Sequence, residues 1–190
     1  MKKIALDLDG VVFDSENLYR VYAEMHDVDK FKCDNLIDNS PRTFQKRYNW
    51  NEDEFKLFYD ENAKKVLSTA NIMTGADIVI KKLMNNFEII IVTARDDEEL
   101  LIAKDKLNEL GLCNVEIFNN EHSKIQRLID EKCDYIIDDD ENICRQASEK
   151  GINSIYFKNA ASTLVESTCN FKVVNNWGEI YKYLNLNAYK

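Results

Sequence analysis

Two aspartates, Asp7 and Asp9, stand one residue apart near the start of the 190-residue chain. The apolar residues at positions 4–6 and 8 give this stretch the continuous apolar character of a strand covered on both faces. Because side chains alternate along a strand, both carboxylates are predicted to face the same side at its carboxyl end. Acids crowded in this way need a cation or a proton. A plain turn at Asp9 and Gly10 is the alternative, but it leaves the second acid unexplained.

Polar residues also follow two later apolar runs. Thr93 and Arg95 come after one run, and Asp138 and Asp139 come after another. In open parallel sheets, ligands bind outside the carboxyl ends of the strands, so these side chains are expected to share one crevice. Acidic clusters there would repel one another without a divalent cation, and oxygen-only ligands favour Mg²⁺. Alternatively, Thr93 is simply a β-branched residue of the kind that strands favour. The acids from Asp138 onward could likewise be those that favour the start of a helix.

Lys124 is predicted to lie in the first turn of a helix whose N-cap is Ser123. A lysine there opposes the helix dipole by about 0.3–1 kcal/mol, so an anion is expected nearby. A phosphate group would meet this expectation, and Glu121 is the alternative partner.

These residue types suit the transfer of a phosphoryl group. A carboxylate beside Mg²⁺ can act as a nucleophile toward phosphorus, and Asp7 is the candidate. Asp9 could protonate the leaving alkoxide and later take a proton from the hydrolytic water. Predicted phosphate-binding groups are contributed by Thr93, Ala94, Arg95 and Lys124, and predicted metal ligands by Asp7, Asp9, Asp138 and Asp139.

The elements that would position these residues alternate along the chain. Strands are predicted over Lys2–Leu8, Glu88–Thr93, Asn114–Phe118, Asp134–Ile137, Ser154–Phe157 and Phe171–Val174. Helices are predicted over 76–86, 97–110, 123–132, 141–150 and 177–184. This alternation predicts an α/β fold with a mostly parallel, Rossmann-like sheet flanked by helices.

A stretch without convincing strands interrupts this pattern after the first strand. Its predicted helices cover 15–27, 41–49 and 52–67, which indicates a small helical cap over 13–71 and a core built from 1–12 and 72–190. Aromatic and basic residues of this stretch could hold a substrate, or its aromatic residues could form the seam between cap helices: Phe13, Tyr19, Arg42, Phe44, Arg47, Tyr48 and Trp50.

Composition limits the partners. A formal charge of −9 and a pI near 4.8 argue against binding a nucleic-acid polymer, because phosphate backbones are held by clustered Lys and Arg. Five cysteines without a CxxC pair indicate reduced thiols rather than a disulfide framework or a zinc site. With no secretory signal or bilayer-spanning run, we expect a cytoplasmic protein, a monomer or homodimer, that does not bind membranes.

Four short motifs, in order, resemble those of the haloacid dehalogenase superfamily. They read DLDGV, an apolar strand ending in Thr93, a helix-borne Lys124, and IIDDD. The resemblance implies a Rossmann-like core with a C1-type cap inserted after the first motif. It also implies that Asp7 is the nucleophile and Asp9 the acid and base, and that the backbone carbonyl of Asp9 contacts the metal.

The resemblance further implies that Thr93 and Lys124 hold the phosphoryl group and that Asp138 and Asp139 complete the Mg²⁺ site. The short cap and the chain length are most similar to the 5′(3′)-deoxyribonucleotidase-like branch and its bacterial nucleotidases. The second motif of this chain reads Thr93-Ala94-Arg95, where the deoxyribonucleotidases have Thr-Ser-Pro.

The sequence thus predicts an Mg²⁺-dependent phosphomonoesterase that forms an aspartyl phosphate and acts on a small phosphorylated substrate, a (deoxy)nucleoside monophosphate. Alternatives are a phosphatase for a sugar phosphate or phosphoglycolate, a phosphotransferase such as a mutase, and a regulatory module that binds a phosphate ligand without turnover.

Overall fold

A six-stranded parallel sheet forms the centre of the protein. The structure is a computed structural model that describes residues 1–41, 44–119, 123–159 and 170–187. Its strands lie in the order β3-β2-β1-β4-β5-β6, and every neighbouring pair is parallel. The strands are β1 (Lys2–Leu6), β2 (Phe87–Val92), β3 (Glu116–Phe118), β4 (Tyr135–Asp138), β5 (Asn153–Phe157) and β6 (Lys172–Val174). The predicted α/β fold class is confirmed.

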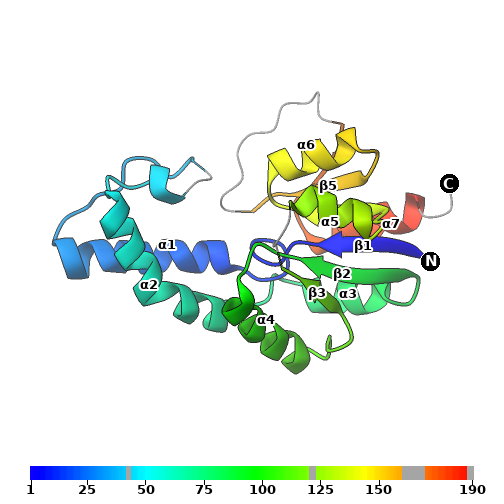
Figure 1. Ribbon diagram of the computed structural model, residues 1–190, viewed down its shortest axis with the longest axis horizontal. Coiled ribbons are helices and arrows are strands. Elements are labelled where there is room, and N and C mark those ends of the chain that lie inside the picture. Colours follow the sequence, from blue (N-terminus) through cyan, green and yellow to red (C-terminus); the bar gives the residue numbers. More distant parts are fainter. Residues whose placement is uncertain (42–43, 120–122, 160–169, 188–190) are drawn as a thin grey trace.

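Helices cover both faces of the sheet, as Figure 1 shows. They are α3 (Ala76–Leu83), α4 (Asp97–Glu109), α5 (Lys124–Asp130), α6 (Glu141–Glu149) and α7 (Trp177–Asn187). Apolar residues of α3, α4 and α7 pack with Ile4 and Ile137 on one face. Residues of α5 and α6 pack with Ala5 and Ile136 on the other. Alternate side chains of β1 and β4 therefore enter different cores, which explains their continuous apolar character.

The segment after β1 carries two helices that extend away from the sheet (Figure 1). These are α1 (Ser15–His26) and α2 (Glu52–Thr69), with a π-helical turn η1 (Asp27–Phe31) and a 3₁₀ helix η2 (Phe44–Lys46) between them. A capping box starts α2, in which Asn51 and Glu54 each accept a hydrogen bond from the other's backbone N–H. None of the helices in the described part of the chain is long and apolar enough to cross a lipid bilayer.

The predicted helix over 41–49 is wrong. Among the described residues of this range, 41 and 44–49, only η2 is helical, and Tyr48 forms a bridge with Leu36. The Arg47 carbonyl accepts hydrogen bonds from the backbone N–H groups of Ile37 and Asp38, at 2.7 and 3.2 Å. These contacts with an earlier segment replace the local bonds that a helix needs, and helical periodicity alone does not reveal them.

Aromatic residues between α1 and α2 form a small core of their own. Tyr48 and Trp50 stack with ring centroids 4.4 Å apart, and Phe58 packs against Trp50. The Trp50 indole N–H donates to buried Asp27 at 2.6 Å. The seam interpretation therefore holds for Tyr48 and Trp50. Phe13 belongs to the main core and Arg47 is buried, while Arg42 and the Phe44 side chain lie outside the described residues.

Candidate active site

Three carboxylates meet where β1 and β4 end. These strands pair with Leu6 opposite Ile137, so Asp7 and Asp138 follow at the same edge of the sheet. A hydrogen bond of 2.9 Å from the Asp7 backbone N–H to the Ile137 carbonyl continues the ladder by one step. One carboxylate oxygen from each of Asp7, Asp138 and Asp139 lies within 4.8 Å of the corresponding oxygens of the other two residues. All three residues are buried. The first strand ends at Leu6 rather than at the predicted Leu8, so Asp7 and Asp9 lie just beyond it.

Lys124 joins two of these acids. Its Nζ lies 3.0 Å from Asp7 Oδ1 and 2.8 Å from Asp138 Oδ2, and the side chain is 8% exposed. It is the first residue of α5, with Ser123 in the N-cap position. The anion predicted near this lysine is thus present as a pair of carboxylates, while Glu121 lies outside the described residues. A buried ammonium at this position requires such partners, because the helix dipole opposes it.

The cluster carries more acid than one lysine can balance. Burial raises the pKa of Asp7 to about 8, since the opposing effect of Lys124 is outweighed by desolvation and the neighbouring acids Asp138 and Asp139. Burial likewise raises the pKa of Asp138, and the two contacting acids hold the pKa of Lys124 above its usual value. A divalent cation would stabilise the ionised carboxylates, and an all-oxygen donor set suits Mg²⁺. The residues present therefore fit a magnesium site.

The Asp7→Asn variant is expected to be more stable than the wild type when metal is absent. The folded protein holds the Asp7 proton up to about pH 8, whereas the unfolded chain releases it near pH 3.8. Between these values the folded state binds more protons, so raising the pH lowers the free energy of unfolding of the wild type. Asparagine removes this contribution. Urea unfolding in EDTA should show an advantage of the variant that grows from pH 5 to pH 8, and an advantage independent of pH would contradict the assignment.

A glycine makes room for the acidic cluster. Gly10 has a φ of +79°, and a Cβ atom there would collide with Asp139 Oδ2 and Asn159 Nδ2. The Asn159 amide donates to Asp139 Oδ2 at 2.6 Å and to the Gly10 carbonyl at 3.0 Å. This amide thereby links the loop after β1 to the acids after β4, and glycine is required both for the backbone conformation and for space.

Gly10→Ala should therefore reduce both stability and any activity of the site. We expect a loss of about 1–2 kcal/mol in the free energy of unfolding from the left-handed backbone alone, and a displaced Asp139 in addition. Gly151→Ala is a matched control, because Gly151 has a φ of +80° but no atom within 4 Å of the added Cβ. Equal losses of stability and unchanged Mg²⁺ binding in both variants, measured by urea unfolding and calorimetry, would refute a role for Gly10 in the site.

Asp9 points away from the other acids and toward Arg95. The Arg95 Nε and Nη2 atoms each donate to a different Asp9 oxygen at 2.8 Å, which forms a bidentate pair. Arg95 is buried, whereas the Asp9 side chain is 33% exposed. The predicted phosphate ligand Arg95 thus contacts the predicted acid and base directly. The Asp9 carboxylate does not belong to the cluster of Asp7, Asp138 and Asp139.

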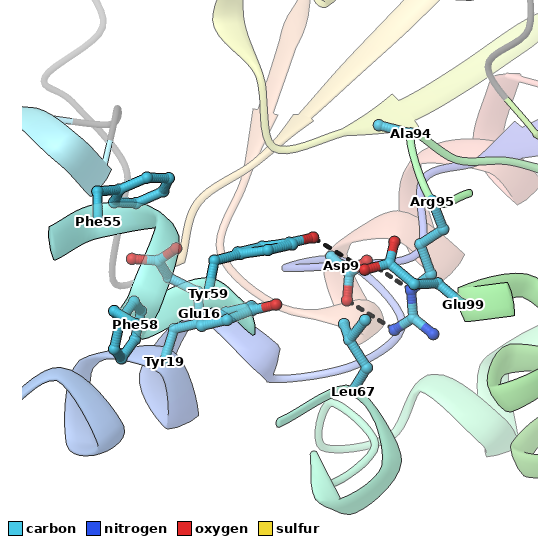
Figure 2. Close-up of a pocket in the computed structure, with 10 residues that line it drawn as sticks. All are labelled: Asp9, Glu16, Tyr19, Phe55, Phe58, Tyr59, Leu67, Ala94, Arg95 and Glu99. Carbon is cyan, nitrogen blue, oxygen red and sulfur yellow. Dashed lines mark hydrogen bonds and ion pairs between the residues drawn. The ribbon is translucent and has the colours of Figure 1, made fainter. Parts of the chain in front are cut away.

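Two cavities meet at Asp9. A cavity of about 240 Å³ is lined by Asp7, Thr93 and Asp139 together with Gly10 and Ser15. A second cavity of about 280 Å³ lies between the helical segment and the core, and Figure 2 shows its lining. Both cavities are lined by Asp9, Glu16, Tyr19 and Ala94. The Thr93 hydroxyl is 3.4 Å from the Arg95 backbone N–H, at the start of the turn after β2.

Sequence reasoning missed several residues of this region, among them one after a strand and three on helices. Asn159 stands two residues after β5, so extending the inspection of strand ends to β5 would have found it. Glu16, Tyr59 and Glu99 lie on helices, where nothing in the local pattern distinguishes them from surface residues. Of the proposed substrate-binding residues of the insertion, Tyr19 lines both cavities.

A scan of the sequence against protein-family models finds no match, and neither does a search of curated proteins.

Solved structures of haloacid dehalogenase-like hydrolases share the fold. One from Streptococcus pneumoniae superposes with a TM-score of 0.72 at 16% identity, covering 97% of this chain and 98% of its own. One from Deinococcus radiodurans, with bound phosphate and sodium, has a TM-score of 0.71 at 12% identity and coverage of 98% and 96%. The hydrolase YfnB from Bacillus subtilis, bound to magnesium, has a TM-score of 0.65 at 14% identity and coverage of 97% and 98%. The chain therefore has the haloacid dehalogenase-like fold over nearly its whole length.

Proposed function

We propose that the protein is an Mg²⁺-dependent phosphomonoesterase that forms an aspartyl phosphate on Asp7. The observation that carries this proposal is the cluster of Asp7, Asp138 and Asp139 around Lys124, placed beside a cavity at the carboxyl ends of the strands. The shared fold, and the phosphate and metal ions bound by proteins with that fold, support it. The predicted roles of the site residues are part of the proposal.

In this reaction an ionised Asp7 oxygen attacks phosphorus, and the bond from phosphorus to the ester oxygen breaks. Asp9 donates a proton to the leaving oxygen, which departs as a neutral alcohol. Asp9 then removes a proton from a water molecule that attacks the phosphoryl group, so that Asp7 is released and inorganic phosphate forms. Lys124 and Thr93 hold the phosphoryl oxygens, with the backbone N–H groups of the turn at Ala94 and Arg95.

The metal would be held by carboxylate oxygens of Asp7, Asp138 and Asp139 and by the backbone carbonyl of Asp9. When bound, Mg²⁺ supplies positive charge that offsets the repulsion between the Asp7 carboxylate and the anionic phosphoryl group. Lys124 would supply part of the same compensation, since it already contacts that carboxylate.

The helical segment over 13–71 would act as a cap that covers the leaving group, with the core formed by 1–12 and 72–190. As substrate we propose a small phosphate ester, a (deoxy)nucleoside monophosphate, with a sugar phosphate or phosphoglycolate as the alternative. The alternative has its own support, because one protein of the same fold, from Haemophilus somnus, is a predicted phosphoglycolate phosphatase.

Phosphate release from a panel of esters tests this proposal. The panel contains ribo- and deoxyribonucleoside monophosphates, sugar phosphates, phosphoglycolate and an aryl phosphate, each with Mg²⁺ and with EDTA. Release that requires Mg²⁺ and is fastest with nucleotides is the expected result. No release from any ester by folded protein whose melting temperature rises with Mg²⁺ would replace the proposal with a phosphate-binding module.

A further inference from the structure

The cavity between the helical segment and the core lies on the far side of Asp9 from the phosphoryl site. Its volume of about 280 Å³ is near the lower end of small-molecule pockets, which span roughly 300–1,000 Å³. Asp9, Glu16, Tyr19 and Ala94 line both this cavity and the one beside Asp7. If Asp9 delivers its proton to the leaving oxygen, the leaving group must extend past Asp9 into this cavity. The chemistry of its walls then decides which esters fit.

One wall is aromatic. The rings of Tyr19 and Tyr59, from α1 and α2, are nearly parallel, with an interplanar angle of 8° and centroids 6.4 Å apart. Figure 2 shows these rings one above the other, with their hydroxyl groups toward Asp9 and with Phe55 and Phe58 at their other side. Parallel aromatic faces favour contact with another flat ring, because offset stacking adds dispersion and quadrupole attraction to apolar burial. A puckered or strongly hydrated group gains less from such a wall.

An acidic residue adjoins this aromatic wall. Glu99 is 9% exposed and accepts hydrogen bonds from the Tyr59 hydroxyl at 2.8 Å and from the Asp96 backbone N–H at 3.3 Å. Within the described part of the chain, no lysine or arginine forms an ion pair with it. Glu99 therefore adds an acidic group without an ion-pair partner to the lining of the cavity.

Acidic residues outnumber basic ones in the described lining of the cavity, where Asp9, Glu16 and Glu99 face one arginine. Arg95 is the one basic residue among the described residues that line it, and two of its nitrogens bind Asp9. Glu16 is held by Arg20 at 3.1 Å and by the fully buried Arg47. The remaining Arg95 nitrogen, Nη1, is buried and has no hydrogen-bond partner. A leaving group with its own carboxylate would therefore meet several acids and this single cation, at a cost in binding free energy.

We infer that this cavity selects leaving groups that are flat and uncharged, and that Tyr59 and Glu99 are the residues that determine this selection. The inference rests on the proposed function for the position of the leaving group. It favours esters whose leaving group carries an uncharged flat ring, such as the base of a nucleoside monophosphate, and disfavours phosphoglycolate, whose leaving group carries a carboxylate.

Three synthetic esters separate shape from charge. Benzyl phosphate and cyclohexylmethyl phosphate both have primary alcohol leaving groups but differ in ring planarity. The compound 4-carboxybenzyl phosphate adds one negative charge to the flat ring. We expect kcat/KM for benzyl phosphate to exceed that for the cyclohexyl ester by about threefold to tenfold, as aromatic stacking is worth about 0.5–1.5 kcal/mol. We expect it to exceed that for the carboxylated ester by at least about tenfold, since an unpaired charge is costly to bury.

Variants assign each preference to a residue. Tyr59→Leu should remove the preference for the flat ring, whereas Tyr181→Leu, on α7 and outside both cavities, should leave all three kcat/KM values unchanged. Glu99→Gln keeps an oxygen for the Tyr59 hydroxyl but removes the charge, so it should raise kcat/KM for the carboxylated ester alone, by about fivefold or more. A variant that lowers all three values equally would have a structural role, which would overturn the assignment.

Binding of non-hydrolysable analogues keeps the inference separate from the proposed function. Benzylphosphonate and 4-carboxybenzylphosphonate are titrated into the wild type with Mg²⁺ by calorimetry. Tighter binding of benzylphosphonate, with a smaller difference between the two affinities in Glu99→Gln, supports the cavity assignment. This holds even if no ester is hydrolysed, in which case the proposed function alone fails. Equal binding of the two phosphonates, or equal kcat/KM for the three esters, overturns the inference whether or not phosphate is released.

Discussion

Replacement of Asp7 by asparagine is expected to lower the rate of phosphate release by at least about a thousandfold, because loss of a nucleophile removes the covalent path. Asparagine has nearly the same shape, so the neighbours Lys124 and Asp138 can keep their 2.8 Å contact. The variant should fold and, without metal, should be more stable than the wild type. Its inactivity would thus reflect chemistry rather than unfolding. Steady-state phosphate release with the best ester of the panel measures the effect.

Asp105→Asn provides the matched control, since Asp105 is exposed on α4 and lies outside the acidic cluster. This variant should retain wild-type turnover. An Asp7→Asn protein within about tenfold of the wild type would show that Asp7 is not the nucleophile, since a tenfold change corresponds to only about 1.4 kcal/mol of barrier.

Lys124→Met is expected to have the second largest effect, and it acts on stability as well as on activity. Methionine leaves Asp7 and Asp138 buried without their shared ammonium, and breaking a buried ion pair from one side costs about 3–5 kcal/mol. Loss of a phosphate ligand should in addition reduce kcat/KM by about a hundredfold or more. Urea unfolding in EDTA and phosphate release in Mg²⁺ measure the two effects separately.

A second substitution distinguishes lost charge from lost packing. If unpaired carboxylates cause the instability, Asp138→Asn should raise the free energy of unfolding by more in the Lys124→Met background than in the wild type. Lys104→Met, at an exposed position of α4, should change neither stability nor turnover. Additive effects in the double variant would mean that Lys124 stabilises the protein through its packing.

The acidic cluster was predictable because each of its members follows a pattern that can be read locally. Asp7 and Asp138 come directly after apolar runs, and parallel strands bring their carboxyl ends to one edge of the sheet. Lys124 was predictable from its position in the first turn of a helix. For these residues the fold class, once inferred, fixes which side chains meet.

The surroundings of Asp9 were not predictable in this way. Arg95 is 86 residues from Asp9 in the sequence, and their pairing depends on side-chain conformations that no periodicity specifies. Tyr59 reaches Glu99 because α2 packs beside α4, a contact between separate elements. The failed helix over 41–49 has the same origin, because its backbone groups bind a segment that precedes it.

The most direct test of the account is whether a phosphoryl group becomes attached to Asp7 during turnover. The protein is mixed with Mg²⁺ and excess substrate, quenched in acid within the first turnovers, digested with trypsin, and analysed by mass spectrometry. If Asp7 is the nucleophile, the peptide of residues 4–20 gains the mass of one phosphoryl group at Asp7. Hydroxylamine removes this modification, and the Asp7→Asn protein lacks it. Full turnover with this peptide unmodified, and an equally active Asp7→Asn variant, would contradict the account.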